Sequence, residues 1–297
     1  MQELAGRVAV VTGGASGIGR GMGEVFLERG MKVVLADVEA AALETTVGEL
    51  AKDGGEVIGV ACDVSSSDAV AKLRDEALER FGKVHVLCNN AGVASGGDGR
   101  ATWEAAPEDW DWVMGVNFDG VLHGIRHFIP TMIDQGEPGH IVNTASLAGL
   151  MHGMGSYGVS KHAVVALSES IWNELRQRNH PIGVSVLCPG WVRTRIMESE
   201  RNRPESPRPD PGDRRPDAEL MRRMVAEMIE QGTDPAESGR IVADAIEADR
   251  FYVLPHPQWK NVIENRMRRI LDEQDPVGVP PEGGMGIDWP PSEKEGA

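Results

Sequence analysis

Short β-branched runs alternate with longer amphipathic stretches along most of this 297-residue chain, and this alternation limits the possible folds more than any other feature. Most of the short runs are apolar throughout, as expected of strands buried on both faces. Strands separated by helical segments form a parallel sheet with helices on both faces. We therefore predict an α/β domain of three layers, in which the sheet lies between two layers of helices (αβα). The predicted strands are Val8–Thr12, Lys32–Ala36, Val57–Cys62, Val84–Asn89, His140–Thr144, Gly183–Cys188 and Arg250–Leu254.

The alternation breaks after about residue 190. The stretch "RIMESERNRPESPRPDPGDRRP" (195–216) is rich in proline and charge, so it predicts an irregular insertion rather than a core element. Such an insertion in a compact domain is commonly disordered or an active-site lid. We predict one domain over residues 1–274 with a substrate lid at about 195–231, followed by a Pro-, Gly- and acid-rich tail over residues 275–297.

The net charge, the apolar stretches and the cysteine positions argue against several classes of partner and site. A net charge of -16 disfavours nucleic acid and anionic membrane surfaces, because both would repel the chain. No apolar stretch reaches the roughly 18 residues that a membrane span needs, and the first residues lack the features of a signal peptide, so we expect a cytoplasmic protein. Cys62, Cys88 and Cys188 lie in apolar runs without metal-ligand spacing, which predicts buried, reduced thiols and no metal site.

A glycine-rich turn follows the first predicted strand, with Gly13, Gly17 and Gly19 in the pattern G-x-x-x-G-x-G, and a helix is expected to begin near Ile18. A pyrophosphate can sit at such a junction, because free N–H groups and the positive end of the helix dipole point to one spot. Glycines allow the tight turn and the close approach.

The second predicted strand is followed by Asp37, eighteen residues after Gly19. An acid at this position can accept hydrogen bonds from an adenosine ribose. Its carboxylate would repel a 2′-phosphate, and neither Val38 nor Ser16 supplies a compensating positive charge. The sequence therefore favours NAD over NADP as the cofactor.

Tyr157 and Lys161 are four residues apart, so they share a face if they lie on a helix. The residues from Ser160 to Arg178 support a helix there. Oxidation of a secondary alcohol by NAD needs a base for the hydroxyl proton. A tyrosine would need its pKa of about 10 lowered by roughly three units, or about 4 kcal/mol. A nearby ammonium and a positive nicotinamide ring both act in that direction.

Seven motifs, in order, resemble the short-chain dehydrogenase/reductase family over about residues 5 to 255. They are "TGGASGIG" (Thr12–Gly19), "CDV" (Cys62–Val64), "NNAG" (Asn89–Gly92), "GVNFDGV" around Asn117, "IVNTAS" ending at Ser146, "YGVSK" from Tyr157 to Lys161, and "PGWVRT" (Pro189–Thr194). The resemblance implies a Rossmann-type doubly wound parallel sheet of about seven strands. It also implies an NAD-dependent oxidoreductase that interconverts a secondary alcohol and a ketone, assembled as a homotetramer or homodimer.

The resemblance assigns the catalytic roles to Asn117, Ser146, Tyr157 and Lys161. Ser146 would donate a hydrogen bond to the substrate oxygen. Asn117 would hold a water that links Lys161 to solvent. Because Ala145 replaces the first serine of the usual pair, Thr144 remains an alternative for the hydroxyl role. The predicted cofactor contacts are Gly13, Ser16, Gly17, Ile18, Gly19, Asp37, Asp63, Val64, Asn90, Ala91, Gly92, Tyr157, Lys161, Pro189, Gly190, Val192 and Thr194.

The predicted substrate contacts lie in two loops. Met151, His152 and Met154 separate Ser146 from Tyr157, although His152 can also face solvent, and Trp191 can wall the pocket or simply pack. Trp103, Trp110 and Trp112 are expected to pack between helices. The C-terminal extension resembles a subgroup acting on bulky aryl or terpenoid-like alcohols. The Met-rich loop and the lid, which carries "MRRMVAEM", indicate a hydrophobic substrate. An NADP-dependent ketone reductase and a non-catalytic NAD-binding protein remain the alternatives.

Overall fold

The computed structural model describes residues 1, 3–94, 101–204 and 216–276. In that part of the chain, seven parallel strands form one sheet in the order β3-β2-β1-β4-β5-β6-β7. The predicted doubly wound sheet is thereby confirmed. The strands are β1 (Val8–Thr12), β2 (Lys32–Asp37), β3 (Val57–Ala61), β4 (Val86–Asn89), β5 (Gly139–Thr144), β6 (Ile182–Leu187) and β7 (Tyr252–Val253).

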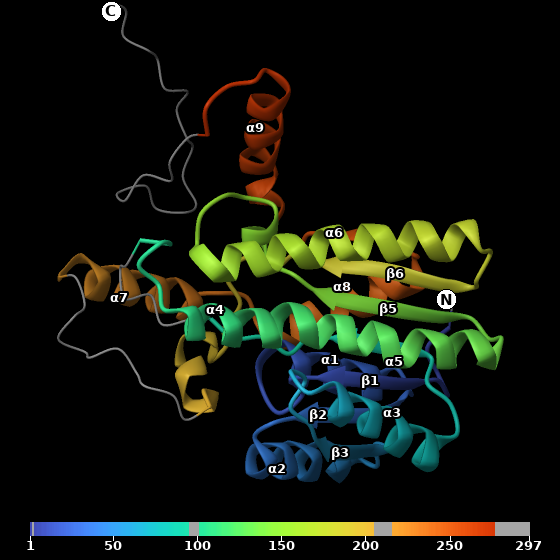
Figure 1. Ribbon diagram of the computed structural model, residues 1–297. Coiled ribbons are helices and arrows are strands. Elements are labelled where there is room, and N and C mark those ends of the chain that lie inside the picture. The colour runs from blue at the N-terminus through green and yellow to red at the C-terminus, as the bar shows by residue number, and fades with distance from the viewer. Residues whose placement is uncertain (2, 95–100, 205–215, 277–297) are drawn as a thin grey trace, which may run out of the picture.

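Helices cover both faces of the sheet and bury its apolar side chains in two cores (Figure 1). One core includes Phe26 and Ile246, and the other includes Phe128 and Val164. The first face carries α1 (Gly17–Glu28), α2 (Ala40–Leu50) and α8 (Pro235–Glu247). The second carries α3 (Ser67–Phe81), α5 (Gly120–Gln135) and α6 (Gly155–Gln177). These two helical layers complete the predicted αβα sandwich.

The ends of α3 illustrate how local sequence sets an element. The Ser66 hydroxyl accepts a hydrogen bond from the Ala69 N–H at 3.3 Å, which caps the first turn. Gly82 ends the helix with a φ of +76°, in the left-handed region where glycine carries no steric penalty. A capping serine and a terminal glycine therefore set the two ends of this helix.

The strand order reverses between β1 and β4, because the chain leaves β1 toward β2 on one side and later returns to place β4 on the other. A crevice forms at the carboxyl ends of the strands at such a switch point. Thr12 at the end of β1 joins the two loops there: its hydroxyl accepts hydrogen bonds from the N–H groups of Asn90 (2.9 Å) and Ala91 (3.1 Å). The strand order alone thus places a crevice at the carboxyl ends of β1 and β4.

Three further helices depart from the simple alternation. α4 (Pro107–Met114) continues through a π-helical turn (Gly115–Asp119) into α5, while α7 (Pro216–Glu230) lies at one end of the sheet (Figure 1). α9 (Lys260–Leu271) projects from the body and has no buried residue in the described structure. Among the helices described, none is long and apolar enough to cross a membrane.

The described first part of the insertion after β6, up to residue 204, contains local helical structure. Ile196–Asn202 form a 3₁₀ helix, and two polar residues near it, Ser199 and Arg203, are buried. The segment was predicted to be irregular rather than a core element, and these two buried side chains are held by hydrogen bonds rather than by apolar packing. Residues 205–215 of the predicted lid and 277–297 of the predicted tail lie outside the described residues.

The cysteine prediction is confirmed by the structure. Cys62, Cys88 and Cys188 are all free thiols, and all three are buried.

Candidate active site

A cavity of about 1200 Å³ opens at the carboxyl ends of the strands, under the 3₁₀ helix and α7. Most of the predicted site residues line it: Gly13, Ser16, Gly17, Ile18, Asp37, Asp63, Val64, Asn90, Ala91, Gly92, Thr144, Ser146, Met151, Met154, Tyr157, Lys161, Pro189, Gly190, Trp191, Val192 and Thr194. Gly19, Asn117 and His152 are not among the described residues that line it. One cavity therefore brings together residues from nearly the whole length of the domain.

The glycine-rich turn has the backbone conformation that its sequence requires. Gly13 and Gly17 have φ values of +65° and +52°, in the left-handed region. A Cβ at Gly13 would come within 2.9 Å of the Ala91 Cα, and one at Gly19 within 2.1 Å of the Gly13 carbonyl oxygen. Gly19 thus lies behind the turn, which explains why it does not line the cavity.

The turn leads directly into α1, which begins at Gly17. Ser16 precedes the helix without a side-chain cap among the described contacts, so the N–H groups of the first turn are not used by that side chain. A phosphate fits such an uncapped helix N-terminus, because N–H groups and dipole both favour negative charge. The residues present therefore fit the pyrophosphate of a dinucleotide.

Asp37 is held by the backbone on both of its carboxylate oxygens. Oδ2 accepts the Ala15 N–H and Oδ1 accepts the Glu39 N–H, each at 3.0 Å. A carboxylate offers about four lone-pair positions, so two remain for ribose hydroxyls. At the end of β3, Asp63 makes a similar turn, with Oδ1 accepting the N–H (2.9 Å) and hydroxyl (2.7 Å) of Ser65.

Tyr157 and Lys161 lie on one face of α6, as their spacing predicts, and this helix begins at Gly155. The Lys161 Nζ lies 5.7 Å from the centroid of the Tyr157 ring and donates a hydrogen bond to the Thr144 carbonyl oxygen at 3.0 Å. Burial lowers the pKa of Lys161 to about 8. Burial also raises the pKa of Tyr157, while a hydrogen bond with Ser146 acts in the opposite direction.

The two candidate hydroxyls differ in their partners. Thr144 is buried, and its hydroxyl donates to the Asn90 Oδ1 at 3.3 Å. Ser146 is half-buried, accepts the Ala148 N–H at 3.1 Å, and is in hydrogen-bond contact with Tyr157. The geometry therefore favours Ser146 over Thr144 as the hydroxyl beside the tyrosine.

Asn117 lies in the π-helical turn and is fully buried. Its Oδ1 accepts the Val93 N–H at 2.8 Å, and its Nδ2 donates to the Val93 carbonyl (2.9 Å) and the Ser160 hydroxyl (3.1 Å). Ser160 in turn donates to the Tyr157 carbonyl at 2.8 Å. The Asn117 side chain therefore joins the loop after β4 to α6. Such π-helical turns are frequent at functional sites.

His152, Met154 and Trp191 do not share one environment. Met154 is more than half exposed and lines the cavity with Trp191. His152 is half-buried, and its Nε2 is buried without a hydrogen-bond partner among the described residues. Trp191 also buries its Nε1 without such a partner.

Several residues that line or shape the cavity were not predicted to do so, among them Trp103, Trp110 and Trp112, which were expected to pack between helices. Trp110 and Trp112 line it instead of packing only between helices, and the Arg203 guanidinium lies 5.2 Å from the Trp112 ring while pairing with Asp109. Their position on α4, just before the Asn117 motif, is the one signal that could have found the two tryptophans.

His256 supports the loop that begins with Pro189. The Gly190 N–H donates to its Nδ1 at 3.0 Å, and its Nε2 lies 3.1 Å from the Trp191 carbonyl oxygen. Burial is the main cause that lowers the pKa of His256, so the neutral ring, with Nε2–H donating, fits both contacts. Because it lies 66 residues away from Gly190 in the sequence, no local pattern predicts it.

Across the described residues, no group of three or more His, Cys, Asp or Glu is placed to hold a metal ion.

Comparison with known proteins gives one consistent result. Residues 7–205 match the profile of a family described as short chain dehydrogenase. A crystal structure of a short chain dehydrogenase/reductase from Burkholderia phymatum in complex with NAD is 43% identical. It superimposes with a TM-score of 0.89, covering 94% of this chain and 99% of that one.

Two curated relatives match over nearly their whole length. The C alpha-dehydrogenase of Sphingobium sp. SYK-6 is 34% identical, over 95% of this chain and 91% of that protein. The 1-deoxy-11-beta-hydroxypentalenate dehydrogenase of Streptomyces exfoliatus is 33% identical, over 97% and 96%. Both names describe dehydrogenases.

Proposed function

The chain belongs to the short chain dehydrogenase family of oxidoreductases, and we propose that it uses NAD to interconvert a secondary alcohol and a ketone on a hydrophobic substrate. The observation that carries the proposal is the meeting of Tyr157, Lys161 and Ser146 in one cavity with the glycine turn and Asp37. Glycine turns and Tyr-x-x-x-Lys pairs occur separately for structural reasons. Their convergence at the switch point of the sheet favours catalysis.

In this proposal the bound NAD supplies the hydride acceptor. Tyr157 takes the proton from the substrate hydroxyl as the carbon gives up its hydride and the carbonyl forms. The Lys161 ammonium stabilises the phenolate that this requires. Ser146 donates a hydrogen bond to the substrate oxygen while its charge develops. Asn117 positions the loop after β4 and the first turn of α6, since its amide is engaged by Val93 and Ser160.

We assign the cofactor contacts to the turns that follow the strands. The glycine turn would take the pyrophosphate, and the Asp37 carboxylate would accept hydrogen bonds from the adenosine ribose and repel a 2′-phosphate. The complex of the Burkholderia phymatum relative with NAD supports the same preference. The loop Pro189–Thr194, which His256 supports, would lie beside the nicotinamide.

The substrate proposal rests on an apolar and aromatic wall. Met154, Trp110, Trp112 and Trp191 line the cavity, and Val225 and Ile229 of α7 extend the wall. The relatives named for a hydroxypentalenate and for C alpha oxidation support a bulky ring-containing alcohol. We propose that residues 195–231 act as the lid of this pocket. A homodimer or homotetramer and a cytoplasmic location stay predictions.

The test is NADH formation by wild type and Tyr157→Phe over a panel of aryl, terpenoid and steroid secondary alcohols. Loss of a general base lowers the rate by about 100-fold to 10,000-fold, so turnover should almost vanish in the variant. NADH binding, measured without substrate, should persist in the variant, because Tyr157 is only one of many predicted cofactor contacts. Turnover that survives in Tyr157→Phe would show that another residue is the base. Tight NADH binding without turnover on any alcohol would favour a binding protein.

A further inference from the structure

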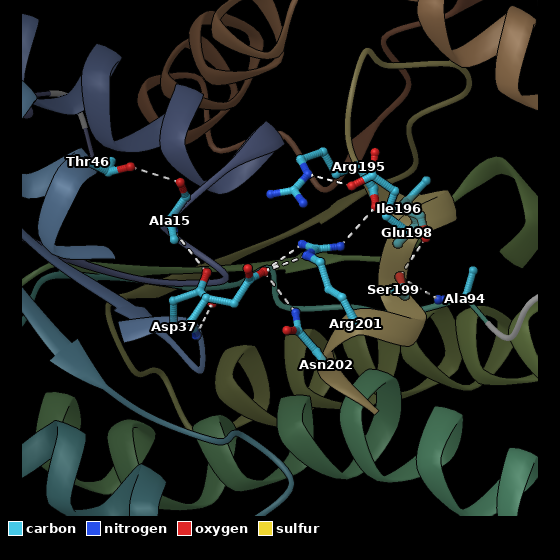
Figure 2. A network of polar contacts seen from close by, with 11 residues as sticks. Ala15, Asp37, Thr46, Ala94, Arg195, Ile196, Glu198, Ser199, Arg201 and Asn202 are labelled. Carbon is cyan, nitrogen blue, oxygen red and sulfur yellow. Dashed lines mark hydrogen bonds and ion pairs between the residues drawn. The ribbon is translucent and has the colours of Figure 1, made fainter. Parts of the chain in front are cut away.

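The segment Arg195–Arg203, here called the strap, is held to two distant loops at the mouth of the cavity (Figure 2). Arg201 contacts Glu39, which follows β2 and lies 162 residues earlier in the chain. The Ser199 hydroxyl accepts a hydrogen bond from the Ala94 N–H, after β4, at 3.2 Å. The strap therefore joins the end of β2, where Asp37 lies, to the end of β4.

The contact with Glu39 converges on one carboxylate oxygen. Its Oε1 accepts the Arg201 Nε at 2.9 Å, and the Arg201 Nη2 lies 2.6 Å from it. The Asn202 Nδ2 donates to the same oxygen at 2.9 Å. Only about a quarter of each charged side chain is exposed (26% and 24%), so solvent screens this pair less than it screens a fully exposed one. The hydrogen bond from Arg201 is the main cause that holds the pKa of Glu39 below its usual range.

This pair lies beside the predicted ribose site. The Glu39 N–H donates to the Asp37 Oδ1, and both residues line the cavity together with Arg201. An arginine in this place would by itself favour a 2′-phosphate, because guanidinium binds phosphate strongly and in a defined geometry. The residues next to Asp37 in the sequence carry no positive charge, because Arg201 belongs to the strap, which follows β6.

We propose that Glu39 is a second determinant of the choice between NAD and NADP, because it occupies Arg201 and so withholds that cation from a 2′-phosphate. The inference rests on the proposed NAD-binding function and adds a residue to it. Asp37 repels the phosphate, whereas Glu39 removes the group that would attract it. Specificity of this kind combines an attraction for one ligand with a repulsion for the other.

The energetics favour this assignment. A 2′-phosphate could bind Arg201 only after the arginine left Glu39. That exchange would leave the Glu39 carboxylate without its cation, beside Asp37 and the phosphate. Replacement of Glu39 by glutamine keeps the shape and removes the charge, so Arg201 becomes available. NADH has no 2′-phosphate, so its affinity depends much less on this exchange.

The experiment titrates purified protein with NADH and with NADPH, without substrate, and follows the fluorescence of the bound reduced cofactor. In Glu39→Gln the Kd for NADPH should fall by about tenfold, while the Kd for NADH should change by less than about threefold. The gain should disappear in the double variant Glu39→Gln/Arg201→Gln, because the cation that produces it is gone. Arg201→Gln alone should bind NADPH no better than wild type.

Glu56→Gln is the matched control. Glu56 pairs with Lys32 at 3.2 Å beside the amino ends of β2 and β3, at the edge of the sheet away from the cavity. This variant changes the net charge by the same amount, so it measures the general electrostatic effect on an anionic cofactor. Both cofactors should bind to it as they bind to wild type.

Two results would overturn the inference: an NADPH gain in Glu39→Gln no larger than in Glu56→Gln, or a gain that persists in the double variant. Either result, with NADH still bound by wild type, leaves the proposed function intact. If wild type binds no NADH, the proposed function fails and the inference fails with it.

Discussion

The Lys161 side chain is 3% exposed and donates its described hydrogen bond to the Thr144 carbonyl oxygen. Burial lowers its pKa to about 8 from an ordinary value of 10.5. Between these two values the unfolded chain binds more protons than the folded one. The free energy of unfolding should therefore rise with pH in that range, and below about pH 8 the fold bears the full cost of burying the ammonium.

Comparison with Lys161→Met isolates this effect, because the variant keeps most of the side-chain volume and has no ionisable group. From about pH 7.5 to about pH 9.5, the unfolding free energy of wild type should gain about 2 kcal/mol relative to the variant. Urea denaturation at both pH values measures the difference. Parallel pH dependence in the two proteins would mean that Lys161 has the same pKa folded and unfolded.

The hydroxyls of Ser146 and Thr144 give a second prediction at this scale. Ser146→Ala should lower kcat/KM for alcohol oxidation by about 100-fold, because a hydrogen-bond donor to the developing oxyanion is lost. Thr144→Val loses a buried hydrogen bond to Asn90, so it should reduce stability by about 1 kcal/mol with much less effect on turnover. Steady-state kinetics and urea denaturation of both variants show which of the two hydroxyls acts on the substrate oxygen. A larger kinetic loss in Thr144→Val would reverse the assignment.

Among the elements, α1 and α8 approach most closely where two glycines meet. A Cβ at Gly239 would lie 2.4 Å from the Gly21 carbonyl oxygen, and one at Gly21 would lie 2.4 Å from the Pro235 carbonyl oxygen. Gly239→Ala should therefore force the two helices apart and reduce stability by about 1–3 kcal/mol.

Gly48 is the control for this prediction, because it lies on the exposed face of α2 and a Cβ there would meet nothing within 4 Å. Gly48→Ala should raise stability by up to about 1 kcal/mol, since alanine favours the helix. Chemical denaturation of the two variants side by side measures both signs. Equal effects would mean that backbone entropy, rather than the helix contact, governs Gly239.

The sequence predicts these elements unevenly, for identifiable reasons. All seven strands were predicted. β1, β2, β4, β5 and β6 are buried along most of their length, as their apolar runs indicate, whereas β3 and β7 at the two edges of the sheet are more exposed. Tyr157 was predicted to lie on the same helix as Lys161, but the start of α6 at Gly155 was not predicted, because Gly155, Ser156 and Gly158 are weak helix formers and contacts with other elements support this turn. One such contact is the hydrogen bond that the Asn117 Nδ2 donates to the Ser160 hydroxyl at 3.1 Å, while Ser160 donates to the Tyr157 carbonyl oxygen at 2.8 Å.

At the scale of the whole molecule, the order of the motifs predicts the residues of the proposed chemistry, but it does not predict which residues form the walls of the cavity. Gly13, Gly17, Ser146, Tyr157 and Lys161 belong to motifs of local spacing, and these five residues line the cavity. His256 and the pair between Glu39 and Arg201 join residues far apart in the sequence, so no local pattern predicts them. These contacts depend on the path of the chain after β6, which brings Arg201 to Glu39 and His256 to Gly190.

The net charge of -16 gives the last prediction. NADH carries two phosphates, so the molecule as a whole repels it, whereas the turn at α1 attracts it only at short range. Raising the salt from about 10 mM to about 150 mM shortens the screening length from about 30 Å to about 8 Å, which weakens the repulsion far more than the local attraction. The association rate of NADH, followed by stopped-flow fluorescence, should therefore rise with salt.

NADPH, with a third phosphate, should show a steeper dependence of its association rate on salt. A rate that falls with salt for both cofactors would mean that the local field at the mouth of the cavity outweighs the charge of the whole chain. The helix N-terminus of α1 and the strap arginines would then steer the cofactor. In that case Arg195, which pairs with Glu198 at 2.7 Å, would be the side chain to neutralise next.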